Sequence, residues 1–147
     1  MKAQTSWVLV ADGAQARIFV NLGTNSGLTV LAGGTFSADS APSGDLDADR
    51  PGRSFDSGGD GRHAMEPHTD PHRHAKDQFA RELTDYLAQQ ADQFDRLVLV
   101  AAPVTLGDIR AHLSASVGGK VIGAVDKDLV HASPDELAPH LDGILLV

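Results

Sequence analysis

Three apolar stretches separated by short turns open the chain. Residues 6–11 (SWVLVA) are apolar at consecutive positions after the first, which is typical of a central strand covered on both faces. The turn signal Asp12-Gly13 follows, and the β-branched and aromatic residues of 16–21 predict a second strand. A third strand is expected over 28–36, after a turn rich in Gly, Asn and Ser. Because the connections are short, these strands should form an antiparallel meander.

A long helix is predicted in the middle of the chain. Asp70 followed by Pro71 is a start signal, with Asp at the capping position and Pro as the first helical residue. We expect the helix to end near Gln93. Apolar residues recur at helical spacing and define a face directed at the core, comprising Phe79, Leu83, Tyr86 or Leu87, and Ala91.

Two further apolar runs predict buried strands in the second half. Residues 96–102 (RLVLVAA) are typical of a parallel strand that Pro103 stops, and 120–125 (KVIGAV) form the last strand. Thr105 is expected to cap the helix between them, which should end at Gly118-Gly119. Residues 133–136 (SPDE) combine a capping box with Pro at the first helical position and predict a short last helix.

This order of elements predicts a single α/β domain over residues 1–147. A meander followed by right-handed crossovers gives a mixed five-stranded sheet of order 3-2-1-4-5, with helices on its faces and strands 1, 4 and 5 parallel. Ligands in open sheets bind at the carboxyl ends of the strands, where the strand order reverses. Asp12, the 102–103 turn and Asp126 are expected at that edge.

The composition excludes several classes of site and partner. Because the chain contains no cysteine, structural disulfides and thiolate metal sites are excluded. No apolar run approaches the roughly 20 residues of a membrane span, and the first is too short for a secretory signal, so we expect a cytoplasmic protein that binds no membrane. A net charge of −8 argues against broad non-specific binding to nucleic acid, although a local basic contact stays open.

One segment differs in composition from the rest. Residues 49–76 hold four of the seven histidines and five of the twelve Lys and Arg residues, interrupted by seven Gly and Pro residues. A loop of this length in a compact domain is usually functional or disordered, and its varied sequence favours function. Phe55 and Met65 are expected to anchor it to the core. We therefore predict a long functional loop over 38–71.

Cationic residues and glycines in this segment suit a phosphate ligand. Arginine binds phosphate through two parallel hydrogen bonds, and glycines expose backbone N–H groups. The candidate binding residues are Arg50, Arg53, Ser54, Gly58, Gly59, Arg62, His63 and Arg73. Five acidic residues in the same segment leave the alternative that the arginines pair internally and order the loop.

Histidines in the segment also suggest a divalent metal. His68, Asp70 and His72 are closely spaced ligands of the kind that bind Zn²⁺, although no HExxH-like spacing is present. The alternative is a polar, solvated junction between loop and helix. No other cofactor is expected.

Carboxylates at strand ends leave a nuclease as an open alternative, whereas a Ser–His nucleophile and base is not favoured. Asp12, Asp126 and Asp128 follow strands and could hold the two Mg²⁺ ions of a nuclease, although Asp in a turn usually serves the backbone. Ser54 or Ser57 beside His63 could form a nucleophile and base, but the chain lacks the GxSxG elbow of a hydrolase.

Long strings of this sequence resemble a bacterial family. These strings are WVLVADGAQARIF (7–19), DRPGRSFDSGGDGRHAMEP (49–67), FDRLVLVAAP (94–103) and DKDL (126–129). Together they resemble the host attachment protein family, also called protein required for attachment to host cells, over nearly the whole chain. The family name describes a phenotype and states no chemistry.

The order of elements is also similar to the middle domain of eukaryotic and archaeal peptide-chain release factors. This resemblance implies a ribonuclease-H-like fold, in which a Gly-Gly-Gln loop before a long helix acts at the ribosomal peptidyl-transferase centre. Here Gly58-Gly59 is followed by Asp60, so the glutamine that would position the hydrolytic water is absent. The resemblance therefore implies a loop that contacts the ribosome or RNA more than it implies peptide release.

These observations lead to three functional hypotheses. The first is a non-enzymatic binding module whose Gly/Arg/His loop contacts a partner, with ribosome or RNA as candidates, and which affects bacterial attachment indirectly. The alternative is a metal-dependent nuclease or another hydrolase that uses the loop histidines or the strand-end carboxylates. The third is a cytosolic scaffold for a cell-surface attachment pathway.

Overall fold

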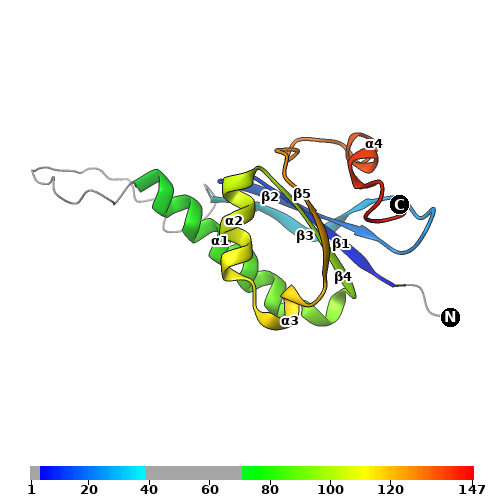
Figure 1. Cartoon of the computed structure of the whole chain (residues 1–147), viewed down its shortest axis with the longest axis horizontal. Coiled ribbons are helices and arrows are strands. Elements are labelled where there is room, and N and C mark those ends of the chain that lie inside the picture. The colour runs from blue at the N-terminus through cyan, green and yellow to red at the C-terminus, as the bar shows by residue number, and fades with distance from the viewer. Residues whose placement is uncertain (1–3, 39–70) are drawn as a thin grey trace, which may run out of the picture.

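The computed structural model describes residues 4–38 and 71–147, which form one mixed five-stranded sheet with helices (Figure 1). β1 pairs antiparallel with β2 and parallel with β4, and the order β3-β2-β1-β4-β5 confirms the predicted α/β fold. The ribonuclease-H-like comparison stays a prediction. The strands are β1 (Ser6–Ala11), β2 (Gln15–Asn21), β3 (Thr29–Ser37), β4 (Arg96–Ala101) and β5 (Val121–Val125).

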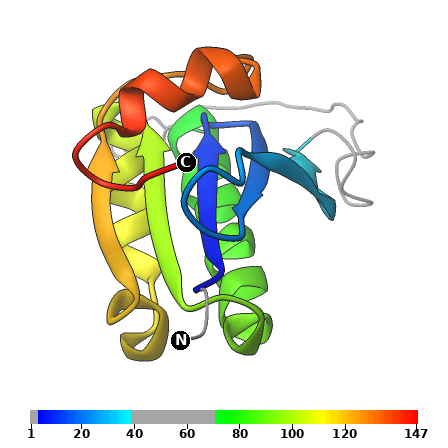
Figure 2. The same cartoon turned by 90° about the vertical axis from the view of Figure 1, so that its right-hand side faces the viewer.

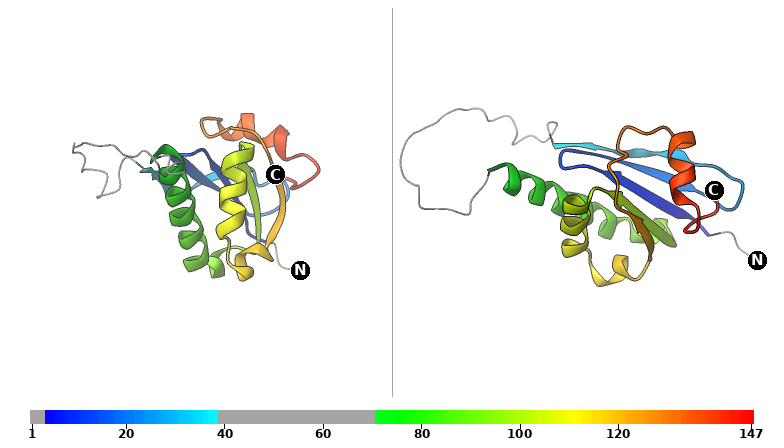
Figure 3. Two further views of the ribbon diagram at one scale, coloured as in Figure 1. Left: turned by 60° about the vertical axis from the view of Figure 1, so that its left-hand side comes forward. Right: turned by 45° about the horizontal axis from the view of Figure 1, so that its top comes forward.

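The helices divide between the two faces of the sheet (Figures 1 and 2). One face is covered by α1 (Pro71–Gln89), α2 (Pro103–His112) and α3 (Ala115–Gly118). The other is covered by α4 (Pro134–Leu137) and the 3₁₀ turn η5 (Ala138–Leu141). A further 3₁₀ turn, η4 (Ala91–Gln93), lies between α1 and β4. Figure 3 shows α1 and α2 side by side.

Burial on both faces explains the continuous apolar run of β1. Trp7 and Leu9 belong to the apolar cluster beneath α1 and α2, whereas Val8 and Val10 belong to the cluster beneath α4. All six residues of β1 are buried. Because alternate residues of a strand face opposite sides, a strand covered on both sides is apolar at every position.

The second helical region differs from the prediction. Thr105 lies inside α2, because Pro103 is the first helical residue and does not merely end the strand before it. The single helix expected between β4 and β5 is two helices, since Leu113 is extended. Ser114 caps α3, and its Oγ accepts a hydrogen bond from the Val117 N–H at 3.2 Å.

The other helix limits are close to the prediction. α1 starts at Pro71 as expected but ends at Gln89, and the chain continues in the tighter 3₁₀ geometry of η4 that often follows a helix end. The predicted capping box of α4 is confirmed. Ser133 Oγ accepts from the Glu136 N–H at 3.1 Å, and Glu136 Oε1 accepts from the Ser133 N–H at 2.8 Å.

Residues 142–147, for which the sequence predicts no regular element, close the apolar cluster beneath α4. Leu145 is buried in that cluster beside Leu137 and Leu141. The Gly27 N–H, in the turn between β2 and β3, donates to the Val147 carbonyl at 3.1 Å. This last stretch therefore packs as part of the domain.

Candidate functional site

The carboxyl ends of β1, β4 and β5 lie at one edge of the sheet, at the top in Figure 2. We call it the carboxyl edge. Ala11 pairs with Ala101, so the connections that start at Asp12 and Pro103 begin side by side, and Asp126 follows β5. The strand order reverses between β1 and β4, which is the place where open α/β sheets bind ligands.

Segment 39–70 is flanked on both sides by contacts to the turn after β1. The Ala38 N–H donates to the Ala14 carbonyl at 2.8 Å. In the first turns of α1, the Lys76 side chain covers Gly13, where a Cβ would lie 2.8 Å from Lys76 Cγ. Both described flanks of the segment therefore meet the carboxyl edge.

Most of the candidate residues predicted from the sequence lie outside the described residues. His72 and Arg73 are described, and both lie in the first turn of α1. The binding role of Arg73 and the metal role of His72 stay predictions. The residues outside are Arg50, Arg53, Ser54, Ser57, Gly58, Gly59, Arg62, His63, His68 and Asp70, together with the expected anchors Phe55 and Met65.

Two aspartates at the carboxyl edge, Asp12 and Asp128, accept hydrogen bonds from nearby backbone N–H groups. Asp12 Oδ1 accepts hydrogen bonds from the N–H groups of Ala14 at 2.8 Å and Gln15 at 2.7 Å, which is the usual role of Asp in a turn. Asp128 Oδ1 accepts from the backbone N–H two residues further on, at 3.4 Å. Within residues 4–38 and 71–147, no three His, Asp or Glu side chains gather as metal ligands. The structure thus does not assemble Asp12, Asp126 and Asp128 into a two-metal centre.

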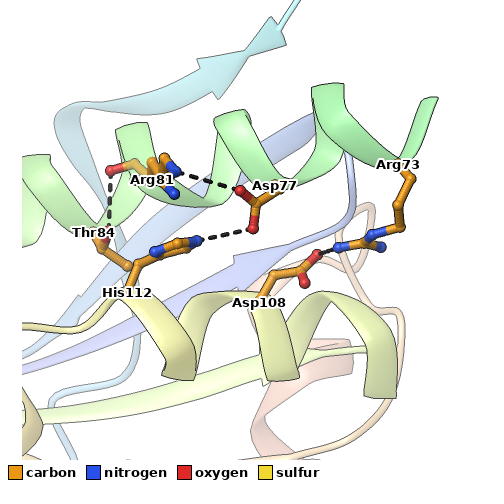
Figure 4. Close-up of polar contacts among 6 residues, drawn as sticks. All are labelled: Arg73, Asp77, Arg81, Thr84, Asp108 and His112. Atoms are coloured by element: carbon orange, nitrogen blue, oxygen red, sulfur yellow. Dashed lines mark hydrogen bonds and ion pairs between the residues drawn. The ribbon is translucent and has the colours of Figure 1, made fainter. Parts of the chain in front are cut away.

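A ladder of polar contacts joins α1 to α2 (Figure 4). Arg73 Nη2 donates to Asp108 Oδ2, and one turn further along, His112 Nε2 lies 2.9 Å from Asp77 Oδ1. Partners in both rungs are 35 residues apart, because α1 and α2 both start at the carboxyl edge and run parallel. Arg73 therefore joins the start of α1 to α2. This contact is separate from the binding role that the sequence predicts for Arg73.

Asp77 is the branching point of this ladder. Its Oδ2 also accepts from Arg81 Nε at 3.3 Å, and Thr84 Oγ1 donates to the Arg81 carbonyl at 3.0 Å (Figure 4). The hydrogen bond with His112 lowers the pKa of Asp77; burial opposes this, and Arg81 adds to the lowering. A carboxylate held in its ionised form is suited to fixing the two helices together.

Sequence reasoning missed this ladder, although a signal for it was present. Arg73 and Asp77 are four residues apart on one helix, and Asp108 and His112 repeat that spacing on the other. Residues at this spacing lie on the same face of a helix. Equal spacing of complementary groups on two helices that run parallel is a pattern that could have indicated the contact.

None of the helices within the described part of the chain has both the length and the apolar character that crossing a bilayer requires.

The fold and the carboxyl edge define a single-sheet α/β protein with a candidate ligand-binding edge. The chain belongs to the family described as protein required for attachment to host cells, whose model matches residues 7–141. The resemblance seen in the sequence strings is therefore confirmed. No curated protein matched the chain.

A solved structure described as "Archaeal protein" shares the fold, with a TM-score of 0.52 and 10% sequence identity. The similarity covers 97% of this chain and 34% of the archaeal chain, so this chain corresponds to about a third of that protein. At this identity the likeness concerns the fold alone. The resemblance to release factors stays a prediction.

Proposed function

We propose that this protein is a non-enzymatic binding module that contacts RNA, and ribosomal RNA in particular, through its carboxyl edge and segment 39–70. It would act in the cytoplasm and affect attachment to host cells indirectly. Membership of the host attachment family supports the link to attachment. The partner and the mode of contact rest on the arguments that follow.

The main structural support for this proposal is the position of the two flanks of segment 39–70. Ala38 and Lys76, on either side of segment 39–70, both contact the turn after β1 at the carboxyl edge. The segment between them holds three arginines, two histidines and a Gly58-Gly59 pair. The segment also carries eight Asp and Glu residues, so its arginines and glycines, rather than its net charge, are the features that suit a phosphate backbone near the usual ligand edge of an open sheet.

The net charge of the chain limits this contact to a local one. At −8, the protein as a whole repels a polyanion, so binding must depend on few cations. Each cation that neutralises a phosphate releases counterions, so affinity should fall steeply with salt. Removing a few arginines should then abolish binding.

Co-sedimentation with ribosomes at about 50 mM salt tests this function. The test variant is Arg53→Ala/Arg62→Ala/His63→Ala. The matched control is Arg81→Ala/Arg110→Ala/His140→Ala, which removes the same residue types from exposed helical positions. We expect the wild type and the control to sediment with ribosomes, and the test variant to bind at least about tenfold more weakly, with its log–log salt slope reduced by about two. A wild-type protein that stays in the supernatant at low salt contradicts the RNA assignment.

A further inference from the structure

A second candidate site lies on the face of the sheet that packs against Val130 and α4. A cavity of about 280 Å³ opens between the paired ends of β2 and β3 and the chain after β5. Gln15, Arg17, Thr35 and Ser37 line it from the sheet, and His131 lines it from the opposite side. Gln15 pairs with Ser37 and Arg17 with Thr35, so the four sheet residues share one face.

Among residues 4–38 and 71–147, no carboxylate lines this cavity, although the chain has 20 acidic residues against 12 Lys and Arg. Two neighbouring surface hollows differ in this respect. One is lined by Asp135 and Asp142, and the other by Asp128 and Glu136. Among these three hollows, the one at Arg17 alone combines a cation with a lining free of acid, so it alone favours an anion.

Arg17 is held in place, but no acid in the described part of the chain neutralises it. Its Nη2 donates to the Ala132 carbonyl, and its Cζ lies 4.9 Å from the centre of the Phe19 ring. Its Nε is buried and has no hydrogen-bond partner among the described residues, and no ion pair there includes Arg17. A half-buried guanidinium without an acid is costly, and a bound anion would offset that cost.

We propose that this cavity binds the phosphate group of a small organic phosphate ester. A tetrahedral oxyanion can accept hydrogen bonds from the guanidinium, the Thr35 hydroxyl and the Gln15 amide, which approach from different strands. The volume is at the lower end of small-ligand pockets, which favours a small molecule over a polymer. Val130, which belongs to the apolar cluster on the same face of the sheet as Arg17, supplies an apolar wall for the organic part of the ester. This proposal does not rest on RNA binding.

Titration of the full-length protein with inorganic phosphate and phenyl phosphate, followed by ¹⁵N NMR, tests the site. The buried Nε–H of Arg17 is a local probe, since its proton is shielded from water. We expect both ligands to shift the Arg17 Nε–H signal and the backbone amides of Thr35 and His131. Phenyl phosphate should bind more tightly than inorganic phosphate, because its ring reaches the apolar wall.

Two variants probe the role of Arg17 independently. Arg17→Met removes the charge and retains bulk, and Arg110→Met is its exposed control. Thr35→Glu places a carboxylate opposite Arg17 on an exposed edge-strand position, where the fold should tolerate it, and Thr29→Glu adds the same charge further along β3. Both test variants should weaken phenyl phosphate binding by at least about tenfold, and both controls should retain it.

Three results would overturn the assignment. The first is the absence of any shift at Arg17 Nε with either phosphate. The second is a folded Thr35→Glu protein that binds phenyl phosphate as the wild type does. The third is equal affinity for benzoate, which carries a carboxylate on the same ring and would remove the preference for phosphate.

Discussion

His112 Nε2 lies 2.9 Å from Asp77 Oδ1, and this contact links two helices that are joined in the chain through η4 and β4. The hydrogen bond holds the pKa of Asp77 below its usual value. Because the pKa is lower in the folded state, ionised Asp77 stabilises the fold above the ordinary carboxyl pKa, and this contribution is lost as the pH falls through the folded pKa.

Replacing Asp77 by Asn should therefore have a pH-dependent effect. We expect Asp77→Asn to be less stable than the wild type at pH values above about 5, and the difference to shrink as the pH falls below about 4. Urea unfolding across this range measures it, with Asp85→Asn on the exposed side of α1 as the control. A difference that stayed constant with pH would argue against the pair as its source.

The Leu141 side chain should report on the packing of the carboxyl-terminal segment. It is fully buried between η5 and the sheet, so Leu141→Ala should lower the free energy of unfolding by about 2–5 kcal/mol. Leu146 is 69% exposed, and Leu146→Ala should stay within about 0.5 kcal/mol of the wild type. Chemical denaturation compares the two, and equal effects would show that this segment does not pack as described.

The capping box of α4 predicts a smaller loss. Ser133→Ala removes the acceptor for the Glu136 N–H and should lower the free energy of unfolding by about 1 kcal/mol. Ser116→Ala, at an exposed position of α3, should change little. Thermal unfolding followed by circular dichroism measures both, and the cap would be unimportant if the two variants melted together.

Gly123 in β5 predicts a coupled pair with Ile144. An added Cβ would lie 2.8 Å from Ile144 Cγ2, so Gly123→Ala should cost about 1–3 kcal/mol through overpacking. In Gly123→Ala/Ile144→Ala the clash is removed, so the two losses should not add. Gly107→Ala, where α2 leaves space for a Cβ, should instead stabilise the fold by about 0.5–1 kcal/mol. Additive losses in the double variant would exclude the contact.

Prediction from sequence succeeded where local pattern decides structure. The double-sided burial of β1 is visible as an unbroken apolar run, and Ser133 with Glu136 encodes the start of α4 within four residues. It failed at Thr105, because a proline that ends one element can equally start the next, and both interpretations satisfy the local rules.

The candidate site was less accessible to sequence analysis. The Gly/Arg/His segment stood out by composition, and the turn role of Asp12 was among the alternatives considered. Arg17 did not stand out at all. It lies in a predicted strand, and only the return of the chain at Ala132 places it beside a cavity whose described lining residues include no acid.

By itself, the sequence determined most of the elements, because hydrophobic periodicity and capping act over a few neighbouring residues. The order of the elements then gave the sheet order, and long strings of characteristic residues gave the family. Only the tertiary structure decided which charged groups meet. Asp77 contacts His112, and Arg17 contacts no acid within residues 4–38 and 71–147, because such contacts depend on how segments far apart in the chain are oriented after the core has packed.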